Sequence, residues 1–219
     1  MNLANCYCNL KDKTKYNKWI VEQLGPVLLG VKPAEILSFP TYNSLNDFQE
    51  LIDMLFKINN QVGFVVIYPP EACMKILFYN RKILDETLMD NRVIKFLRKI
   101  GYPENYSLNN YLNLLTNKLR DGEMPHEIGV FLGYPLKDVI GFIGHPSLKL
   151  TKVNRWRVYG HTKVSDVISQ RILAAKKQIK EQLNRFDCDK AKENYSIDEK
   201  YNIAHYEYYL ILLAYFLFN

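Results

Sequence analysis

The sequence has little cysteine. Its 219 residues include Cys6, Cys8, Cys73 and Cys188, which are too few and too scattered for a disulfide framework. Cys6 and Cys8 form a Cys-x-Cys pair, but no second Cys or His pair stands nearby to complete four zinc ligands, so we predict no metal site. The N-terminus is polar and lacks a signal-peptide pattern. These features together predict a location in the reducing cytoplasm.

Long apolar runs and nucleotide-binding motifs are absent too. The C-terminal run 208–218 is about half of the roughly 20 residues that a membrane-spanning helix needs, so we predict no membrane span. An exposed apolar helix would aggregate, and we expect this one to pack on the domain or on a partner, including a second copy of the chain. Neither G-x-x-x-x-G-K-[ST] nor G-x-G-x-x-G occurs, and we predict no cofactor.

The composition, with 48% hydrophobic and 24% charged residues, is that of a folded protein. Apolar spacing predicts helices near 16–24, 45–58, 93–100, 108–119, 136–143 and 162–183, and a short helix that begins at Pro33. Alternating β-branched and aromatic residues predict a hairpin of strands at 63–68 and 74–79, and further strands at 128–132 and 153–159.

This order of elements predicts an α+β fold, with a small, mainly antiparallel sheet of about four strands packed with several helices, plus long C-terminal helices. We assign residues 1–186 to a single domain. Residues 187–219 are then a charged linker followed by the apolar helix.

His126 and Glu127 open the most informative segment, 125–143. Position 130 is Val130 rather than histidine, so the H-E-x-x-H zinc motif is not formed. His126 is a candidate general base or ligand contact because histidine titrates near neutral pH, and the alternative is a hydrogen-bonded structural residue. If 125–132 is extended, Glu127 points away from the face that carries His126. Tyr134 follows at a predicted strand-to-helix junction, where binding groups often lie.

Positive charge is concentrated in one stretch. The chain has a net charge of +6, and the stretch 149–163 holds five basic residues and no acidic one. On a strand, Arg155, Arg157 and Tyr159 would share one face, with Lys152 and Trp156 on the other. Cations interleaved with aromatic rings are typical of single-stranded nucleic acid binding. The alternative is an edge strand protected by charges, with its tryptophan in the core.

Lys32 is a further candidate anion contact. It precedes the helix predicted to begin at Pro33, whose free backbone N–H groups would assist it in holding an anion. The alternative is a surface lysine on a tight connection.

Three segments, 25–34, 125–143 and 156–160, resemble the signature blocks of a bacterial family known as domain of unknown function number 3793. The resemblance implies no particular activity. Members of that family often carry a His-Cys pair before the first block, where this chain has Gln23 and Leu24. A thiol-hydrolase role built on that cysteine would therefore be lost here. His161 also stands where the resemblance implies an acidic residue.

We predict a non-catalytic binding or accessory protein. Its ligand-binding surface, for a small molecule or a protein, comprises His126, Glu127, Tyr134, Trp156 and Tyr159. An enzyme of hydrolase type, with His126 as general base, is the alternative. Nucleic-acid binding through 149–163 is a third hypothesis, and the predicted anion contacts are Lys32, Lys152, Arg155 and Arg157. The predicted binding surface requires the ribbons around 126–132 and 153–159 to lie side by side.

Overall fold

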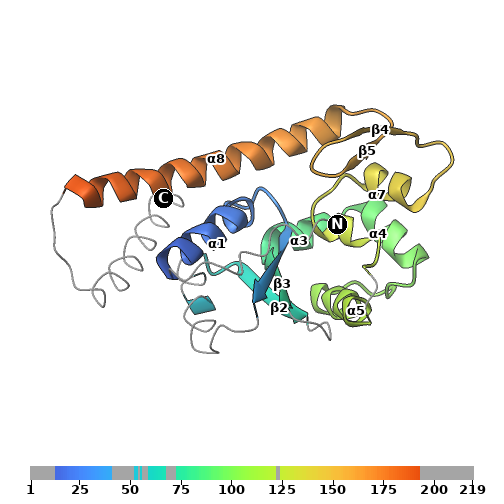
Figure 1. Ribbon diagram of the computed structural model, residues 1–219. Coiled ribbons are helices and arrows are strands. Elements are labelled where there is room, and N and C mark those ends of the chain that lie inside the picture. Colours follow the sequence, from blue (N-terminus) through green and yellow to red (C-terminus); the bar gives the residue numbers. More distant parts are fainter. Residues whose placement is uncertain are drawn as a thin grey trace.

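The protein has the predicted α+β fold, with seven helices and two antiparallel sheets of three and two strands among its described residues (Figure 1). The computed structural model describes residues 13–40, 52, 53, 55, 59–67, 73–121 and 124–192. Most of the helix predicted at 45–58, and the apolar C-terminal helix, lie outside these residues.

The larger sheet has the order β1-β3-β2. Its strands are β1 (Ala34–Pro40), β2 (Val62–Ile67) and β3 (Cys73–Asn80), and β2 and β3 confirm the predicted hairpin. The short helix predicted from Pro33 is wrong, because the chain enters β1 there. Pairing with β3 along the whole of β1 supplies the backbone hydrogen bonds that a helix would otherwise have made.

Helices cover both faces of this sheet. Along β3, Ile76 and Phe78 enter one core, whereas Leu77 and Tyr79 enter the other, as the two-residue period of a strand requires. The first core lies beneath α1 (Lys13–Leu28) and α8 (Lys163–Lys192), which run side by side. Gly25 allows this close approach, since a Cβ there would lie 2.8 Å from Cγ1 of Ile179.

The second core is built by α3 (Arg81–Leu88), α4 (Asn91–Lys99), α5 (Leu108–Arg120) and α6 (Ile128–Phe131). Asn80, Asp90 and Ser107 cap the first three of these helices with side-chain oxygens that accept from backbone N–H groups. The helices predicted at 93–100 and 108–119 are confirmed as α4 and α5. α3 was not predicted.

The strand predicted at 128–132 is wrong, because these residues form α6 and the turn that follows it. Its β-branched and aromatic side chains are buried within the second core, where Val130 is 1% and Phe131 0% exposed. Tertiary packing therefore outweighs the local β preference of this run. Gly133, with φ of 78°, turns the chain into α7 (Leu136–Ile143), which is confirmed as a helix.

The strand predicted at 153–159 is also wrong as a single strand. It is a hairpin of β4 (Leu150–Val153) and β5 (Arg157–Tyr159), closed where the N–H of Asn154 donates to the carbonyl of Trp156 at 2.9 Å. Arg155 and Trp156 therefore occupy the turn and do not alternate across a strand. The side-by-side ribbons that the predicted binding surface required are absent from the described residues.

α8 confirms the predicted long helix and continues to Lys192, past the domain boundary that we assigned at 186. Residues 193–219 are not among those described. No helix within the described ranges combines the length and the apolar character needed to cross a bilayer.

Candidate functional site

A cavity of about 290 Å³ lies between α1, β1, the turn of the β4–β5 hairpin and α8. We call it the basic pocket. It is lined by Trp19 and Gln23 of α1, Lys32, Glu35, Ile36, Leu37 and Ser38 in and before β1, Tyr134, Arg155 and Trp156 of the connecting turns, and Ile172 and Lys176 of α8.

Two stacked aromatic rings form one wall of the basic pocket. The rings of Tyr134 and Trp156 lie 4.7 Å apart and 19° from parallel. Ile172 packs with them in a small apolar cluster that also contains Val158. Burial raises the pKa of Tyr134 to about 12, because the buried phenolate would lose its hydration, and the nearby Glu35 adds to this rise. Tyr134 is therefore a neutral phenol at physiological pH.

Basic side chains outnumber acidic ones among the described residues of this pocket. Lys32 is only 4% exposed, and its Nζ lies 2.8 Å from Oε2 of Glu35 and 5.8 Å from the centre of the Tyr134 ring. This ion pair neutralises Glu35, which is the one acidic residue among the described residues of the lining. Lys176 and Arg155 then remain as two positive charges with no ion-pair partner among the described residues.

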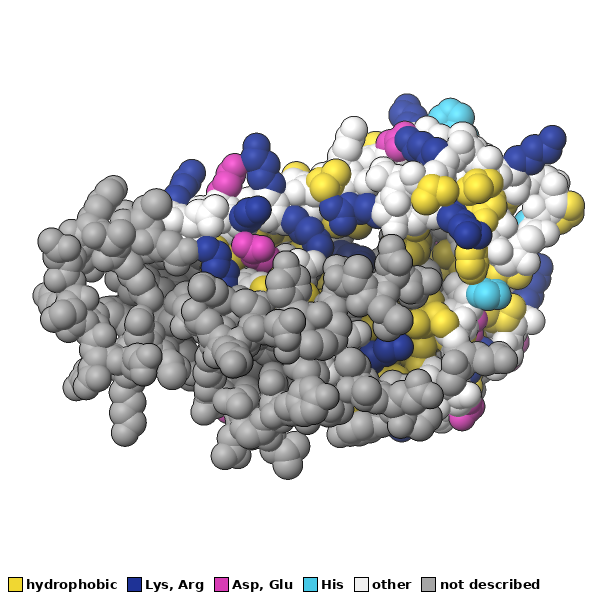
Figure 2. Space-filling model, viewed as in Figure 1, with side chains coloured by type: hydrophobic (Ala, Val, Ile, Leu, Met, Phe, Trp, Pro, Cys, Tyr) yellow, Lys and Arg dark blue, Asp and Glu magenta, His cyan; other side chains and the backbone are white. Residues whose placement is uncertain are grey.

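Lys176 is held in the pocket wall by a hydrogen bond from its Nζ to Oε1 of Gln23 at 2.9 Å. Burial lowers the pKa of Lys176, and the positive charges of Arg155 and Lys32 lower it further, while Glu35 partly opposes them. Arg155 is exposed and makes no ion pair with any residue that the structure describes. Figure 2 shows basic side chains gathered along α8 on the face in view.

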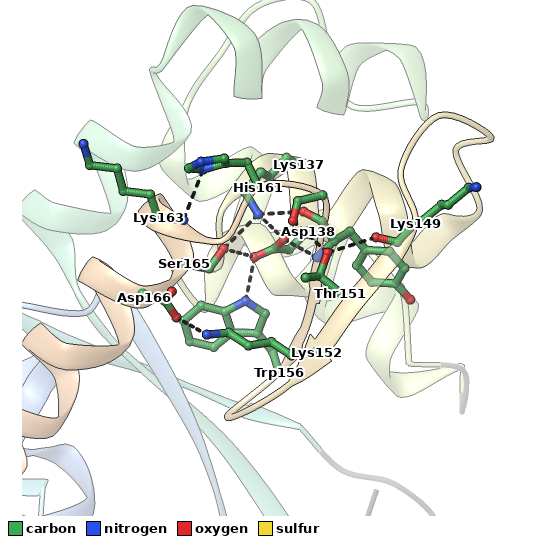
Figure 3. A network of polar contacts seen from close by, with 12 residues as sticks. Lys137, Asp138, Lys149, Thr151, Lys152, Trp156, His161, Lys163, Ser165 and Asp166 are labelled. Carbon is green, nitrogen blue, oxygen red and sulfur yellow. Dashed lines mark hydrogen bonds and ion pairs between the residues drawn. The ribbon is translucent and has the colours of Figure 1, made fainter.

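A buried carboxylate fixes the tryptophan of the aromatic wall (Figure 3). Asp138 of α7 is 2% exposed, and its Oδ2 accepts from Nε1 of Trp156 at 2.7 Å and from the hydroxyl of Ser165 at 2.6 Å. Its Oδ1 accepts from the backbone N–H of Tyr159 at 2.8 Å. One side chain thus ties α7 to the hairpin and to the start of α8.

Lys137 supplies the positive charge that this buried carboxylate needs. Its Nζ donates to Oδ1 of Asp138 at 2.6 Å, to the carbonyl of Tyr159 at 2.8 Å and to the hydroxyl of Ser165 at 2.9 Å. The sequence reasoning did not single out either residue, although a Lys-Asp pair within an apolar helical segment was an available signal, since charged side chains are rarely buried unless paired.

The structure brings together four of the predicted site residues. Lys32, Tyr134, Arg155 and Trp156 all line the basic pocket, although they come from three separate turns. The sequence reasoning missed Trp19, Gln23, Glu35 and Lys176, whose positions on α1, β1 and α8 fit ordinary amphipathic or surface patterns. Gln23 carried one signal, since it stands where the family resemblance implies a histidine.

His126 and Glu127 lie elsewhere. His126 is exposed and contacts Phe142 edge to face, with ring centres 5.1 Å apart. Glu127 is 6% exposed, and its Oε1 accepts from Nζ of Lys118 at 2.6 Å and from the hydroxyl of Tyr102 at 3.3 Å. Both residues belong to a turn and not to an extended strand, so the expectation that they alternate across a sheet is wrong.

The remaining predicted contacts point in different directions. Tyr159 is buried against Gly141 of α7, where a Cβ would lie 2.4 Å from its Cγ. Arg157 lies over the ring of Phe142, 5.6 Å from its centre. Lys152 pairs with Asp166 at 2.6 Å. These residues and Arg155 therefore do not form one continuous basic strip.

The chain matches the family described as Protein of unknown function (DUF3793) over residues 20–190. It belongs to this family. The matched range contains every residue of the basic pocket except Trp19. Comparison with the curated proteins and with the solved structures found no match.

Two positions stand where the DUF3793 resemblance implies a His-Cys pair. Gln23 lines the basic pocket, whereas Leu24 is 0% exposed within the core beneath α1. Within the described ranges, no group of three or more His, Cys, Asp or Glu side chains is placed to hold a metal ion.

Proposed function

We propose that this protein is a non-catalytic binding protein that holds a small anionic ligand in the basic pocket. The observation that carries this proposal is the convergence of Lys32, Arg155 and Lys176 on one cavity whose described lining residues include a single carboxylate, Glu35. A cytoplasmic location belongs to the same proposal and is supported by the low cysteine content.

The state of Lys176 supports an anionic ligand. The charged form of Lys176 loses hydration because the side chain is partly buried, and two nearby cations repel it. Its pKa is lowered for these two reasons. An anion between Lys176 and Arg155 would offset that cost with charge-assisted hydrogen bonds, which are stronger than neutral ones. Groups with perturbed pKa values inside a cavity are typical of functional sites.

The aromatic wall supports a ligand with a flat or apolar part. The stacked pair of Tyr134 and Trp156 presents ring surface to the cavity, and ligand pockets commonly combine such surfaces with a few polar groups. The carboxylate of Asp138 holds Trp156 by its indole N–H, so this wall is fixed before any ligand enters. Preorganisation of this kind lowers the cost of binding.

Binding is favoured over a hydrolase reaction because His126 does not line the basic pocket. A general base has to reach the proton that it removes, within about 3 Å or through one water. His126 instead lies exposed against Phe142, which is also outside the lining of the basic pocket.

The test is the affinity of the intact protein for sulfate, phosphate and acetate, measured by isothermal titration calorimetry. Thermal shifts alone are unsuitable, because sulfate and phosphate stabilise many proteins without binding at a site. We expect Lys176→Gln to weaken binding about 10-fold or more, since hydrogen bonds to charged groups contribute roughly 1.5–3 kcal/mol.

Lys177→Gln is the matched control. Lys177 is the next residue on α8, its side chain is 77% exposed, and it pairs only loosely with Glu181 at 3.7 Å. Its substitution removes the same charge without touching the pocket, so the affinity should stay unchanged. Equal losses in the two variants, or no binding of any of the three anions, would contradict the proposed function.

A further inference from the structure

We infer that the natural occupant of the basic pocket is the C-terminal end of an extended peptide, which pairs with the edge of β1 that faces away from β3 and places its terminal carboxylate between Arg155 and Lys176. This inference rests on the proposed function, because it names the molecule that brings the anionic group.

The first argument is the way β1 lines the cavity. Four consecutive residues, Glu35, Ile36, Leu37 and Ser38, border it. Successive side chains of a strand point to opposite faces, and here Leu37 packs in the core beneath α1 while Ile36 packs against the opposite core. A cavity on one face of the sheet would meet only alternate residues. The basic pocket therefore runs along the edge of β1.

The second argument is the position of β1 in its sheet. Within the part of the chain that the structure describes, β1 is an outer strand and pairs only with β3. The backbone N–H and C=O groups on its other edge are thus directed toward the cavity. An open strand edge is a template for another extended chain, and many domains bind peptides by adding a strand in this way.

Charge and size favour the end of a chain over its middle. A terminal carboxylate is an acceptor that every peptide carries, and Arg155 and Lys176 are the two cations of the described lining that form no ion pair with Glu35. A volume of about 290 Å³ is at the lower limit of ordinary ligand pockets, which span roughly 300–1,000 Å³. Such a cavity suits the last residues of a peptide and not a long internal segment.

The aromatic wall predicts which last residue is preferred. Tyr134, Trp156 and Ile172 offer an apolar surface beside the two cations. A large apolar or aromatic side chain on the terminal residue would bury surface there, whereas a small one would leave it in contact with water.

The experiment titrates the intact protein with a set of acetylated tetrapeptides that end in Ala, Leu, Phe or Tyr, each with a free carboxylate. Binding is followed by isothermal titration calorimetry and by the NMR signals of the Trp156 indole N–H and of Arg155. We expect the peptides ending in Leu, Phe or Tyr to bind more tightly than the one ending in Ala, and all four more tightly than acetate.

Two chemical changes to the best peptide test its binding mode without altering the protein. Amidation removes the carboxylate and should weaken binding at least tenfold. Methylation of backbone nitrogens removes the N–H donors that pair with β1, and it should weaken binding by a similar factor. Among protein variants, Arg155→Gln should weaken binding, while Arg157→Gln should not, because Arg157 of the same hairpin lies over Phe142.

The outcomes separate this inference from the proposed function. If sulfate or phosphate binds through Lys176 but none of the four peptides does, the protein is an anion-binding protein and the peptide inference is wrong. If the amidated peptide binds as well as the parent, the carboxylate makes no contact in the pocket. If the N-methylated peptide binds as well as the parent, the peptide does not pair with β1. Either result means that the inference is wrong. If neither peptides nor simple anions bind, both proposals fail.

Discussion

Replacement of Asp138 by asparagine tests how the aromatic wall of the basic pocket is held. The substitution keeps the shape of the side chain but replaces one acceptor oxygen by an NH2 donor. With the amide oxygen toward Tyr159 N–H and Lys137, the NH2 group faces the indole N–H of Trp156, which cannot accept. With the amide reversed, the NH2 group faces the backbone N–H of Tyr159 and the Nζ of Lys137 instead. Either orientation leaves at least one buried donor unsatisfied.

The expected loss of stability in Asp138→Asn follows from these contacts. An unsatisfied buried donor costs about 1–3 kcal/mol, and exchanging a carboxylate for a neutral acceptor costs about 1 kcal/mol more. We therefore expect Asp138→Asn to lower the free energy of unfolding by about 3 kcal/mol. For a chain of this size that corresponds to a fall in Tm of roughly 6–12 °C.

Urea denaturation followed by circular dichroism measures this loss, and Asp166→Asn is the control. Asp166 stands on α8 beside Ser165, but it is a partly exposed partner of Lys152, so its replacement should cost much less. Trp156→Phe removes the indole donor, and it should be less harmful in the Asp138→Asn background than in the native protein. Equal stabilities of Asp138→Asn and Asp166→Asn would refute the role assigned to the carboxylate.

Three further predictions concern packing, a second buried charge and pH. Gly141→Ala would place a Cβ 2.4 Å from Cγ of Tyr159, and it should destabilise the protein by about 1–3 kcal/mol in the same urea assay, with an unchanged urea midpoint as the contrary result. Glu127→Gln weakens the bonds from Lys118 and Tyr102, and we expect a loss of about 1–3 kcal/mol without any change in anion affinity measured by calorimetry. Sulfate keeps its charge at alkaline pH and binds best to protonated Lys176, so its affinity should be constant at lower pH and should fall as the pH rises through the lowered pKa of this lysine, beginning below 10.5. We expect no such fall in affinity for the Lys176→Arg variant, because arginine stays charged and Tyr134, with a pKa of about 12, stays neutral over this pH range. A fall of equal size in this variant would mean that the titration of another group causes it.

The sequence predicted best those elements whose signal is local. The helices α4 and α5 begin at side-chain caps and carry apolar residues at three- and four-residue steps, and both were predicted near their observed limits. The hairpin of β2 and β3 was predictable for the same reason, because its residue types and its short connection favour adjacent antiparallel strands.

The failures are runs whose local preference was outweighed by packing. Ile128–Phe131 has β-forming side chains, yet it is a short helix because its buried residues fill the core beside α3. Ala34–Pro40 follows a proline that suits a helix start, yet it is a strand because β3 offers a partner along its whole length. Neither partner is visible from the local sequence.

Residue chemistry alone identified Lys32, Tyr134, Arg155 and Trp156 as candidates, because cations and aromatic rings stand out in any chain. Only the tertiary structure decided that these four share a cavity with Lys176, and that His126 does not. The physical reason is that the pocket walls come from positions more than a hundred residues apart, which are joined by the packing of α8 against α1 and by the buried hydrogen bonds of Asp138. Such long-range contacts depend on the whole fold and leave no periodic pattern in the sequence.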